Sequence, residues 1–211
     1  MKNFLSNFGQ TTLKIMGVFF MKRFVFVLLG ILIFGGCAAM PGGGPMAASL
    51  LETVTEQRPV GTPINGGSFS TKYEASLKNR TINLQVSART LDGTVIEPGE
   101  VFSFNEIIGK ATWAKGYRPA KIFIKGKEEQ GLGGGICQLS STLYNAADYA
   151  GMEIVERHPH SKRVYYVEEG RDAATAYKGV DLKFKNPLPY PVMIVTKVDG
   201  GEVTVGFEAI R

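Results

Sequence analysis

The chain has 211 residues, of which 24 are basic and 19 are acidic. Four basic residues and no acidic ones lie in residues 1–36, so the rest of the chain is nearly neutral and gives no electrostatic footprint for binding nucleic acid. Residues 37–211 suit one domain that buries a core without disulfides, and no second domain is required.

Residues 21–36 have the pattern of a secretory signal. Lys22 and Arg23 form a basic start, and residues 24–34, FVFVLLGILIF, are apolar throughout. This stretch is shorter than the roughly 20 apolar residues of a transmembrane helix but suits a signal peptide; the alternative is an uncleaved anchor helix. Because Met21 begins this complete signal, we expect translation to start there and residues 1–36 to form a leader outside the fold.

Gly35 and Gly36 precede Cys37, and this pattern resembles the lipobox of bacterial lipoproteins. In that family the cysteine receives a diacylglycerol thioether and becomes the mature N-terminus. The resemblance implies an extracytoplasmic protein that is lipid-anchored to the cell membrane through Cys37. Residues 37–72, rich in Gly, Pro, Ser and Thr, are interpreted as a flexible tether, and the folded domain is expected over residues 73–211.

The first half of the domain carries weak element signals. Residues 79–91 alternate like a strand at some positions, but the spacing of Leu84, Ala88 and Leu91 favours a helix, ended at residues 92–93. A turn at residues 98–99 is followed by a predicted strand up to Phe104. Clean alternation predicts another strand over residues 121–125.

The clearest helix follows three glycines at residues 133–135. Apolar residues then recur at three- and four-residue spacing, namely Leu139, Leu143, Ala146, Ala147 and Ala150. Gly151 is the expected stop, and Cys137 lies in the first turn.

The remainder is rich in β-strand signals, at residues 152–155, 164–167, 180–184, 192–198 and 203–207. Residues 199–201, Asp-Gly-Gly, predict a hairpin between the last two strands. The whole pattern predicts a single α+β domain with a mainly antiparallel sheet and a helix starting at Cys137.

Several sequence blocks occur in a fixed order: PGEVFSFN (98–105), GYRPA (116–120), GGGICQLSSTLYNA (133–146), ERHPHS (156–161), GRDA (170–173) and DLKFKN (181–186). Together they resemble the VanW-like domain, over about residues 75–208. That family takes its name from accessory proteins of some vancomycin-resistance clusters, and the resemblance implies a cell-envelope setting without an established activity.

Cys137 is left without a disulfide partner, because Cys37 is assigned to the lipid and the chain has two cysteines. A cysteine at a helix N-terminus meets the positive end of the helix dipole, which favours the thiolate. The glycines Gly133, Gly134 and Gly135 permit close approach of a substrate backbone. These features indicate a cysteine nucleophile.

His158 and His160 are the two histidines of the chain, and either imidazole is a candidate base for Cys137. His158 is preferred slightly, because Pro159 is expected to leave it at the end of a rigid strand. Asp172 is a candidate third member that holds the histidine ring, and Gln130 or Gln138 is a candidate oxyanion donor. The order of cysteine, histidine and aspartate resembles thiol enzymes of the transglutaminase-like and papain-like kinds in arrangement.

Structural roles account for the same residues. Cys137 would then be part of the core, the histidines would belong to a turn around Pro159, Asp172 would cap a turn, and the glycines would thread a crowded bend. One cysteine and two histidines without a further ligand do not predict zinc, and we expect no metal and no cofactor.

Two functions remain open at this point. One is a cysteine-dependent hydrolase or acyl-transferase that acts on peptidoglycan peptides or an envelope protein. The other is a non-catalytic envelope module that binds peptidoglycan or a protein partner, accessory to glycopeptide resistance or wall maintenance. The fold does not decide between them.

Overall fold

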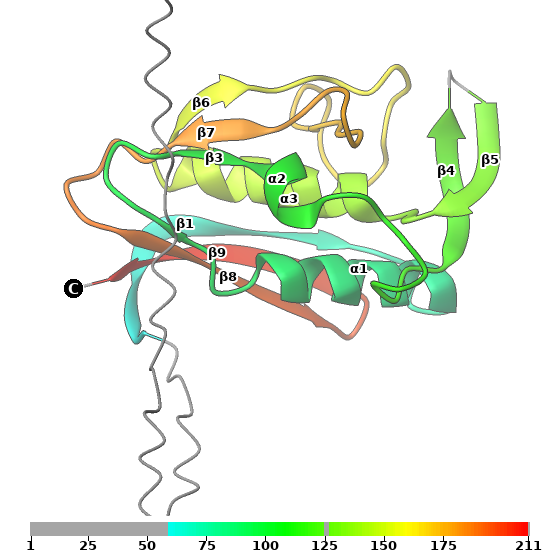
Figure 1. Cartoon of the computed structure of the whole chain (residues 1–211), viewed down its shortest axis with the longest axis horizontal. Helices are drawn as coiled ribbons and strands as arrows, with labels where there is room; N and C mark the ends of the chain where they lie inside the picture. Colours follow the sequence, from blue (N-terminus) through cyan, green and yellow to red (C-terminus); the bar gives the residue numbers. More distant parts are fainter. Residues whose placement is uncertain (1–58, 125–126, 211) are drawn as a thin grey trace, which may run out of the picture. The chain divides into compact units, whose positions relative to one another are not determined.

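The computed structural model describes residues 59–124 and 127–210, so the leader, the signal and Cys37 lie outside the described residues. The helices of the described residues are α1 (Lys78–Leu91), α2 (Phe104–Ile108) and α3 (Ile136–Tyr149) (Figure 1). The strands are β1 (Gly61–Lys72), β2 (Val95–Ile96), β3 (Val101–Ser103), β4 (Pro119–Ile124), β5 (Lys127–Leu132), β6 (Glu153–Glu156), β7 (Lys183–Lys185), β8 (Val192–Asp199) and β9 (Glu202–Ile210).

The described strands form three antiparallel sheets. The largest has the order β1-β9-β8-β2, a second has the order β3-β7-β6, and β4 pairs with β5 as a hairpin. Helix α3 lies between the two larger sheets, and α1 runs along the edge that carries β8 (Figure 1). The predicted α+β class with mainly antiparallel sheets is therefore confirmed.

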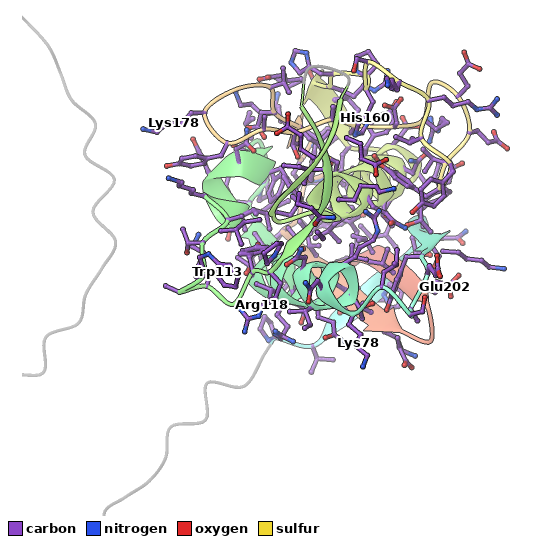
Figure 2. The ribbon with its side chains drawn as sticks, turned by 90° about the vertical axis from the view of Figure 1, so that its right-hand side faces the viewer. Lys78, Trp113, Arg118, His160, Lys178 and Glu202 are labelled. Carbon is purple, nitrogen blue, oxygen red and sulfur yellow. The ribbon has the colours of Figure 1, made fainter. Side chains whose placement is uncertain are left out.

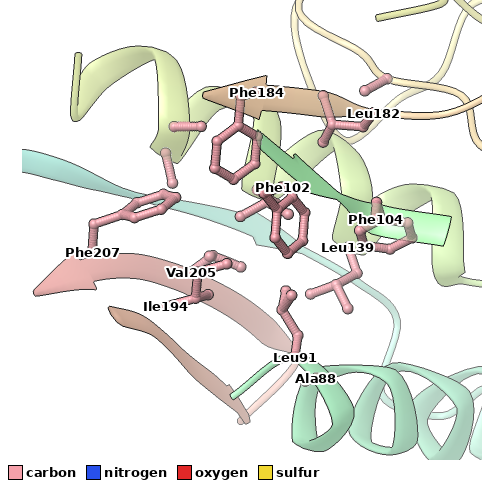
Figure 3. Close-up of a cluster of buried hydrophobic side chains, with 14 of the residues drawn as sticks. Ala88, Leu91, Phe102, Phe104, Leu139, Leu182, Phe184, Ile194, Val205 and Phe207 are labelled. Atoms are coloured by element: carbon pink, nitrogen blue, oxygen red, sulfur yellow. The ribbon is translucent and has the colours of Figure 1, made fainter. Parts of the chain in front are cut away.

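Aromatic side chains join the two larger sheets across the core (Figure 3). Phe102 of β3 stacks on Phe184 of β7 with ring centroids 4.7 Å apart. Phe184 and Phe207 of β9 pack edge to face, with ring centroids 5.8 Å apart. Leu139 and Leu143 of α3 are fully buried in the same cluster. Since each large buried side chain contributes about 1.5–3 kcal/mol, this cluster fixes α3 between the sheets.

The segment 79–91 forms a helix rather than a strand, as predicted. Its buried residues include Leu84, Ala88 and Leu91, together with Asn83 and Ser87 of the same stripe. Ile82, which belongs to the strand-like alternation, is only partly buried. The helical spacing therefore decides which side chains reach the core.

The hairpin between β8 and β9 also forms as predicted. Asp199 pairs with Glu202, and the two loop residues Gly200 and Gly201 have φ angles of 56° and 83°. Positive φ at both loop positions is the geometry that a two-residue hairpin requires, and glycine adopts it without strain.

Strand β1 lies inside the segment 37–72 for which we predicted a flexible tether, so the fold begins earlier than predicted. The strand pairs with β9, with a register shift between Pro63 and Ser68. Its residues are mostly small or polar, and backbone pairing with a long neighbour, rather than an apolar pattern, holds them in the sheet.

Two further predictions differ from the structure, and one strand was missed. Phe104 begins α2 rather than ending a strand, because the side-chain oxygen of Ser103 accepts a hydrogen bond from Glu106 N at 3.2 Å and caps a helix there. Residues 164–167 form no strand, since no described strand pairs with them. Strand β5, Lys127–Leu132, was not predicted because its charged sequence lacks apolar alternation.

Within residues 59–124 and 127–210, no helix is long and apolar enough to cross a membrane.

Candidate functional site

Cys137 is the second residue of α3, which begins one position earlier than predicted, at Ile136. Gly135 occupies the N-cap position with a φ of 117°, and no side chain caps the helix. The thiol is partly exposed and lies 3.4 Å from the carbonyl oxygen of Thr175, to which it donates. The nucleophile candidate thus stands at an open helix N-terminus.

The glycine run in front of Cys137 threads a crowded space. A Cβ atom on Gly134 would come within 2.5 Å of the Lys121 carbonyl oxygen and 2.9 Å of the Ala120 Cβ. The Asn83 side chain fixes the run by donating to the carbonyl oxygen of Gly134 at 3.0 Å. Gly133 has a φ of 85°. The run therefore has a packing role, and it also lines the groove described below.

This crowding gives a stability prediction. Gly134→Ala should lower the free energy of unfolding by about 2 kcal/mol or more, because the backbone carbonyl that it meets cannot move aside. Gly179→Ala is the control, since its Cβ would make only ordinary contacts of 3.4 Å with Ala176. Thermal unfolding of both variants checks this; equal melting temperatures for the two would show that the run tolerates a side chain.

His160 and Asp172 form a tight polar pair. Nδ1 of His160 lies 2.6 Å from Oδ2 of Asp172, and the backbone N–H of His160 donates to the same oxygen at 2.6 Å. The His160 side chain is only 16% exposed. Because the carboxylate occupies Nδ1, the other ring nitrogen, Nε2, is left for a further partner.

The thiol of Cys137 lines the same groove as this imidazole and interacts with it. Burial raises the pKa of Cys137, but the hydrogen bonds to His160 and to the backbone of Thr175, together with the positive charge of His160, outweigh burial, so the net pKa of Cys137 is lowered. Burial lowers the pKa of His160, but hydrogen bonds to Cys137 and Asp172 outweigh it and raise the net pKa. These opposite shifts favour a thiolate and an imidazolium side by side.

Asp172 is placed to stabilise that imidazolium. Burial raises the pKa of Asp172, but the hydrogen bonds from His160 outweigh burial and lower the net pKa, so the carboxylate stays charged. Arg157 holds its other oxygen, with Nη2 2.8 Å from Oδ1. The same guanidinium donates to the backbone carbonyl oxygens of Asp172 and Gly170.

His158 lies elsewhere, although sequence reasoning slightly preferred it as the base. Its Nε2 is 3.0 Å from Oε1 of Glu156, and its side chain is 42% exposed. Strand β6 ends at Glu156, so His158 is not on the strand as predicted. Nζ of Lys183 lies 2.8 Å from Oε2 of Glu156. The hydrogen bond from Lys183 is the main cause that lowers the pKa of Glu156 to about 2.

Polar side chains of α3 hold the segment that carries Asp172 and Thr175. Ser140 Oγ donates to the Ala173 carbonyl oxygen at 2.6 Å, and Ser141 Oγ accepts from Ala173 N at 2.9 Å. One turn later, Asn145 donates to the carbonyl oxygen of Arg171 at 2.7 Å. Sequence reasoning missed these positioning residues and Arg157. The available signal was the run of polar residues inside an otherwise apolar helix.

Gln138 does not have the oxyanion role predicted for it. It is fully buried, and its amide nitrogen donates to Thr71 Oγ1 at 3.1 Å and to the Lys72 carbonyl oxygen at 2.9 Å. Its amide oxygen accepts from Arg80 at 2.7 Å. Both amide hydrogens are therefore used to join α3 to β1. Gln130, by contrast, is exposed on β5 and lines the groove.

A groove of about 1450 Å³ runs over this site. It is bounded by the starts of α1 and α3, the β4-β5 hairpin, and the segments 160–166 and 175–177. Figure 2 faces this side of the molecule, with Lys78 below and His160 above. Cys137 and His160 both line the groove, so a peptide-sized ligand has access to the thiol.

Among the described residues, no group of three or more His, Cys, Asp and Glu side chains could hold a metal ion. Cysteine, histidine and aspartate are the residue types that serve as nucleophile, base and orienting carboxylate in thiol enzymes.

Comparison with known proteins gives the family. YoaR of Bacillus subtilis (strain 168) is 44% identical over 139 residues, which cover 66% of this chain and 46% of the relative. The vancomycin B-type resistance protein VanW of Enterococcus faecalis (strain ATCC 700802 / V583) is 28% identical over 131 residues, 60% of this chain and 48% of that protein. The chain thus spans about half the length of these relatives.

No solved structure matches the chain. The family model of VanW-like proteins matches residues 79–207, which include α1 at one end, the site in the middle and β9 at the other end. This range is more than half of the chain and confirms the resemblance seen in the sequence blocks. The chain belongs to the VanW-like protein family.

Proposed function

We propose that this chain is a cell-envelope thiol enzyme, a hydrolase or acyl-transferase that acts on peptide bonds of peptidoglycan or of an envelope protein. The observation that carries the proposal is that Cys137 and His160 line one groove and that Asp172 holds the ring of His160, with the pKa of the cysteine lowered and that of the histidine raised. Perturbed pKa values of this kind, in residues that line a groove, are typical of catalytic sites.

The proposed reaction begins when the Cys137 thiolate attacks the carbonyl carbon of the substrate and forms a C–S bond. His160 then gives its proton to the leaving amine, and the C–N bond breaks. Water, or a second amine in the case of a transferase, attacks the thioester while His160 accepts its proton. The C–S bond breaks and the thiolate returns, with Asp172 holding the ring throughout.

The start of α3 supplies a donor for the oxyanion in this reaction. The backbone N–H of Cys137 has no acceptor among the described residues and belongs to the first turn of the helix. The Tyr166 hydroxyl, whose pKa is raised by burial and then by the charge of Cys137, is a second candidate donor. Tyr166 also lines the groove.

The envelope setting rests on the signal-like residues 21–36 and on Cys37. The relative named as a vancomycin B-type resistance protein supports a wall-related role. We therefore predict that the native chain incorporates labelled fatty acid and partitions into detergent, and that Cys37→Ala leaves an unlipidated precursor. Finding the native protein in the cytoplasm with residues 21–36 intact would contradict this localisation.

The activity is tested by incubating the protein with purified peptidoglycan and measuring released fragments by mass spectrometry. The wild type should release or join peptide fragments, and Cys137→Ala should release none. If the two proteins bind peptidoglycan equally and neither changes it, the domain is a binding module and the enzyme proposal is wrong.

A further inference from the structure

The groove over Cys137 is lined by more positive than negative charge. Its basic lining residues are Lys78, Arg80, Lys110, Lys121, Lys162 and Arg163, and its acidic ones are Glu74 and Glu128. Lys121 pairs with Glu128 at 2.6 Å, so this pair is neutral. In the part of the chain that the structure describes, the other five basic residues form no ion pair. A groove of this kind attracts anionic ligands.

Arg80 is a basic residue of the groove that contacts the start of α3. Its Nη2 donates to Gln138 Oε1 at 2.7 Å, next to Cys137 in the chain, and its Cγ lies 3.4 Å from where a Cβ on Gly135 would stand. The stem of Arg80 therefore lies beside Gly135, the N-cap residue of α3. Arg80, Cys137 and Tyr166 all line this groove.

The guanidinium of Arg80 is incompletely satisfied. Its Nε is buried and has no hydrogen-bond acceptor, and no carboxylate in the described residues pairs with it. A partly buried cation without a counter-ion is unfavourable, and an incoming anion removes part of that cost. Fixing one nitrogen to Gln138 also orients the planar group in advance, which lowers the entropy that binding must overcome.

We propose that Arg80 determines substrate specificity by binding a carboxylate of the substrate near the peptide bond that Cys137 attacks, so that the ligands of this groove are anionic peptides. The identification of the attacked bond rests on the proposed function, whereas carboxylate binding at Arg80 does not. The open N-terminus of α3 adds to the attraction, and the unpaired lysines around the groove draw in the same charge. Arginine suits this role because its planar fork matches a carboxylate.

The inference is tested by calorimetry on the full chain in detergent, in the Cys137→Ala background, so that no turnover is needed. Two pairs of acetylated tripeptides serve as probes. One pair differs only in a C-terminal carboxylate against an amide, and the other only in an internal glutamate against glutamine. In at least one pair the acidic peptide should bind about tenfold or more tightly than its neutral partner, because one charge-assisted hydrogen bond contributes about that much affinity.

Arg80→Gln should remove this preference and leave the binding of the neutral peptides unchanged within about twofold. Arg89→Gln, on the exposed last turn of the same helix and outside the groove, removes the same charge and should keep the preference. Arg80→Lys keeps the charge but loses the planar guanidinium, so it should show a reduced preference for the acidic peptide. This variant replaces Arg80→Gln in the test if Arg80→Gln does not fold.

Equal binding of acid and neutral peptides in both pairs would overturn the inference, and so would a preference that survives Arg80→Gln. The result is separable from the proposed activity. An Arg80-dependent preference without any cleavage by the wild type would support the anion site and contradict the proposed enzyme activity. Equal cleavage of the acid and neutral peptides would support the enzyme activity and contradict the anion site.

Discussion

Replacing His160 by alanine is expected to slow the alkylation of Cys137 by iodoacetamide at pH 7 at least tenfold. The charge and the hydrogen bond of His160 lower the pKa of Cys137, and without them burial, which disfavours the thiolate, is opposed only by the hydrogen bonds with Thr175. Any thiol-dependent turnover should fall by about 10²–10⁴-fold, because the general acid and base is lost as well. Mass spectrometry of the Cys137 peptide gives the rate without interference from Cys37.

His158→Ala is the matched control, and it should leave the alkylation rate and the turnover within about twofold of wild type. Its ring is bound to Glu156 and is more exposed than that of His160. This ranking reverses the slight preference drawn from the sequence. If His158→Ala abolished the reactivity and His160→Ala left it, the base role would pass to His158.

Asp172→Asn is expected to have the second largest effect, with a loss of turnover of at least about 100-fold. The carboxylate binds both the ring and the backbone N–H of His160, and it helps to raise the pKa of that ring. In the variant the pKa of His160 should therefore fall, which NMR of the imidazole measures directly. The acid and base partner of Cys137 would then be less charged at neutral pH.

Asp199→Asn removes a carboxylate that is 75% exposed in the β8-β9 hairpin, so it should leave both the turnover and the pKa of His160 unchanged. Asp172→Asn also weakens the ion pair with Arg157, so its folding must be checked by circular dichroism. A folded Asp172→Asn variant with wild-type turnover would mean that Asp172 is a structural residue only.

The elements with strong local signals could be predicted from the sequence. The apolar spacing before Gly151 gave α3, and the two glycines after Asp199 gave the β8-β9 hairpin. Strand β1 could not be predicted, because its residues carry no apolar alternation and it is held by backbone pairing with β9 at the far end of the chain. Such long-range pairing leaves no local mark in the sequence.

The site residues were predicted by type, but their pairing was not. Cys137, His160 and Asp172 were all candidates; in the structure Asp172 holds the ring of His160, and His160 and Cys137 line the same groove. Choosing between His158 and His160 required the path of the chain after Glu156, where the strand ends and the backbone of His160 binds Asp172. Local rules around Pro159 do not contain that tertiary contact.

Gln138 shows the opposite case, in which a correct residue type was given the wrong role. A glutamine beside a nucleophile suggests an oxyanion donor, but its hydrogens are taken up by β1, the strand that was not predicted. The positioning residues Ser140, Ser141 and Asn145 were missed for a related reason. Their partners lie in residues 171–173, whose position next to α3 only the fold reveals.

The central claim is that Cys137 and His160 form a reactive thiolate–imidazolium pair, and the pH dependence of Cys137 alkylation tests it most directly. The rate rises with the thiolate fraction as pH increases through the pKa of the thiol. Because that pKa is lowered, the inflection in the native protein should lie below the ordinary value of 9.0, and His160→Gln should move it upward. A thiol that resists alkylation until the protein unfolds would show that Cys137 is a core residue and would contradict the claim.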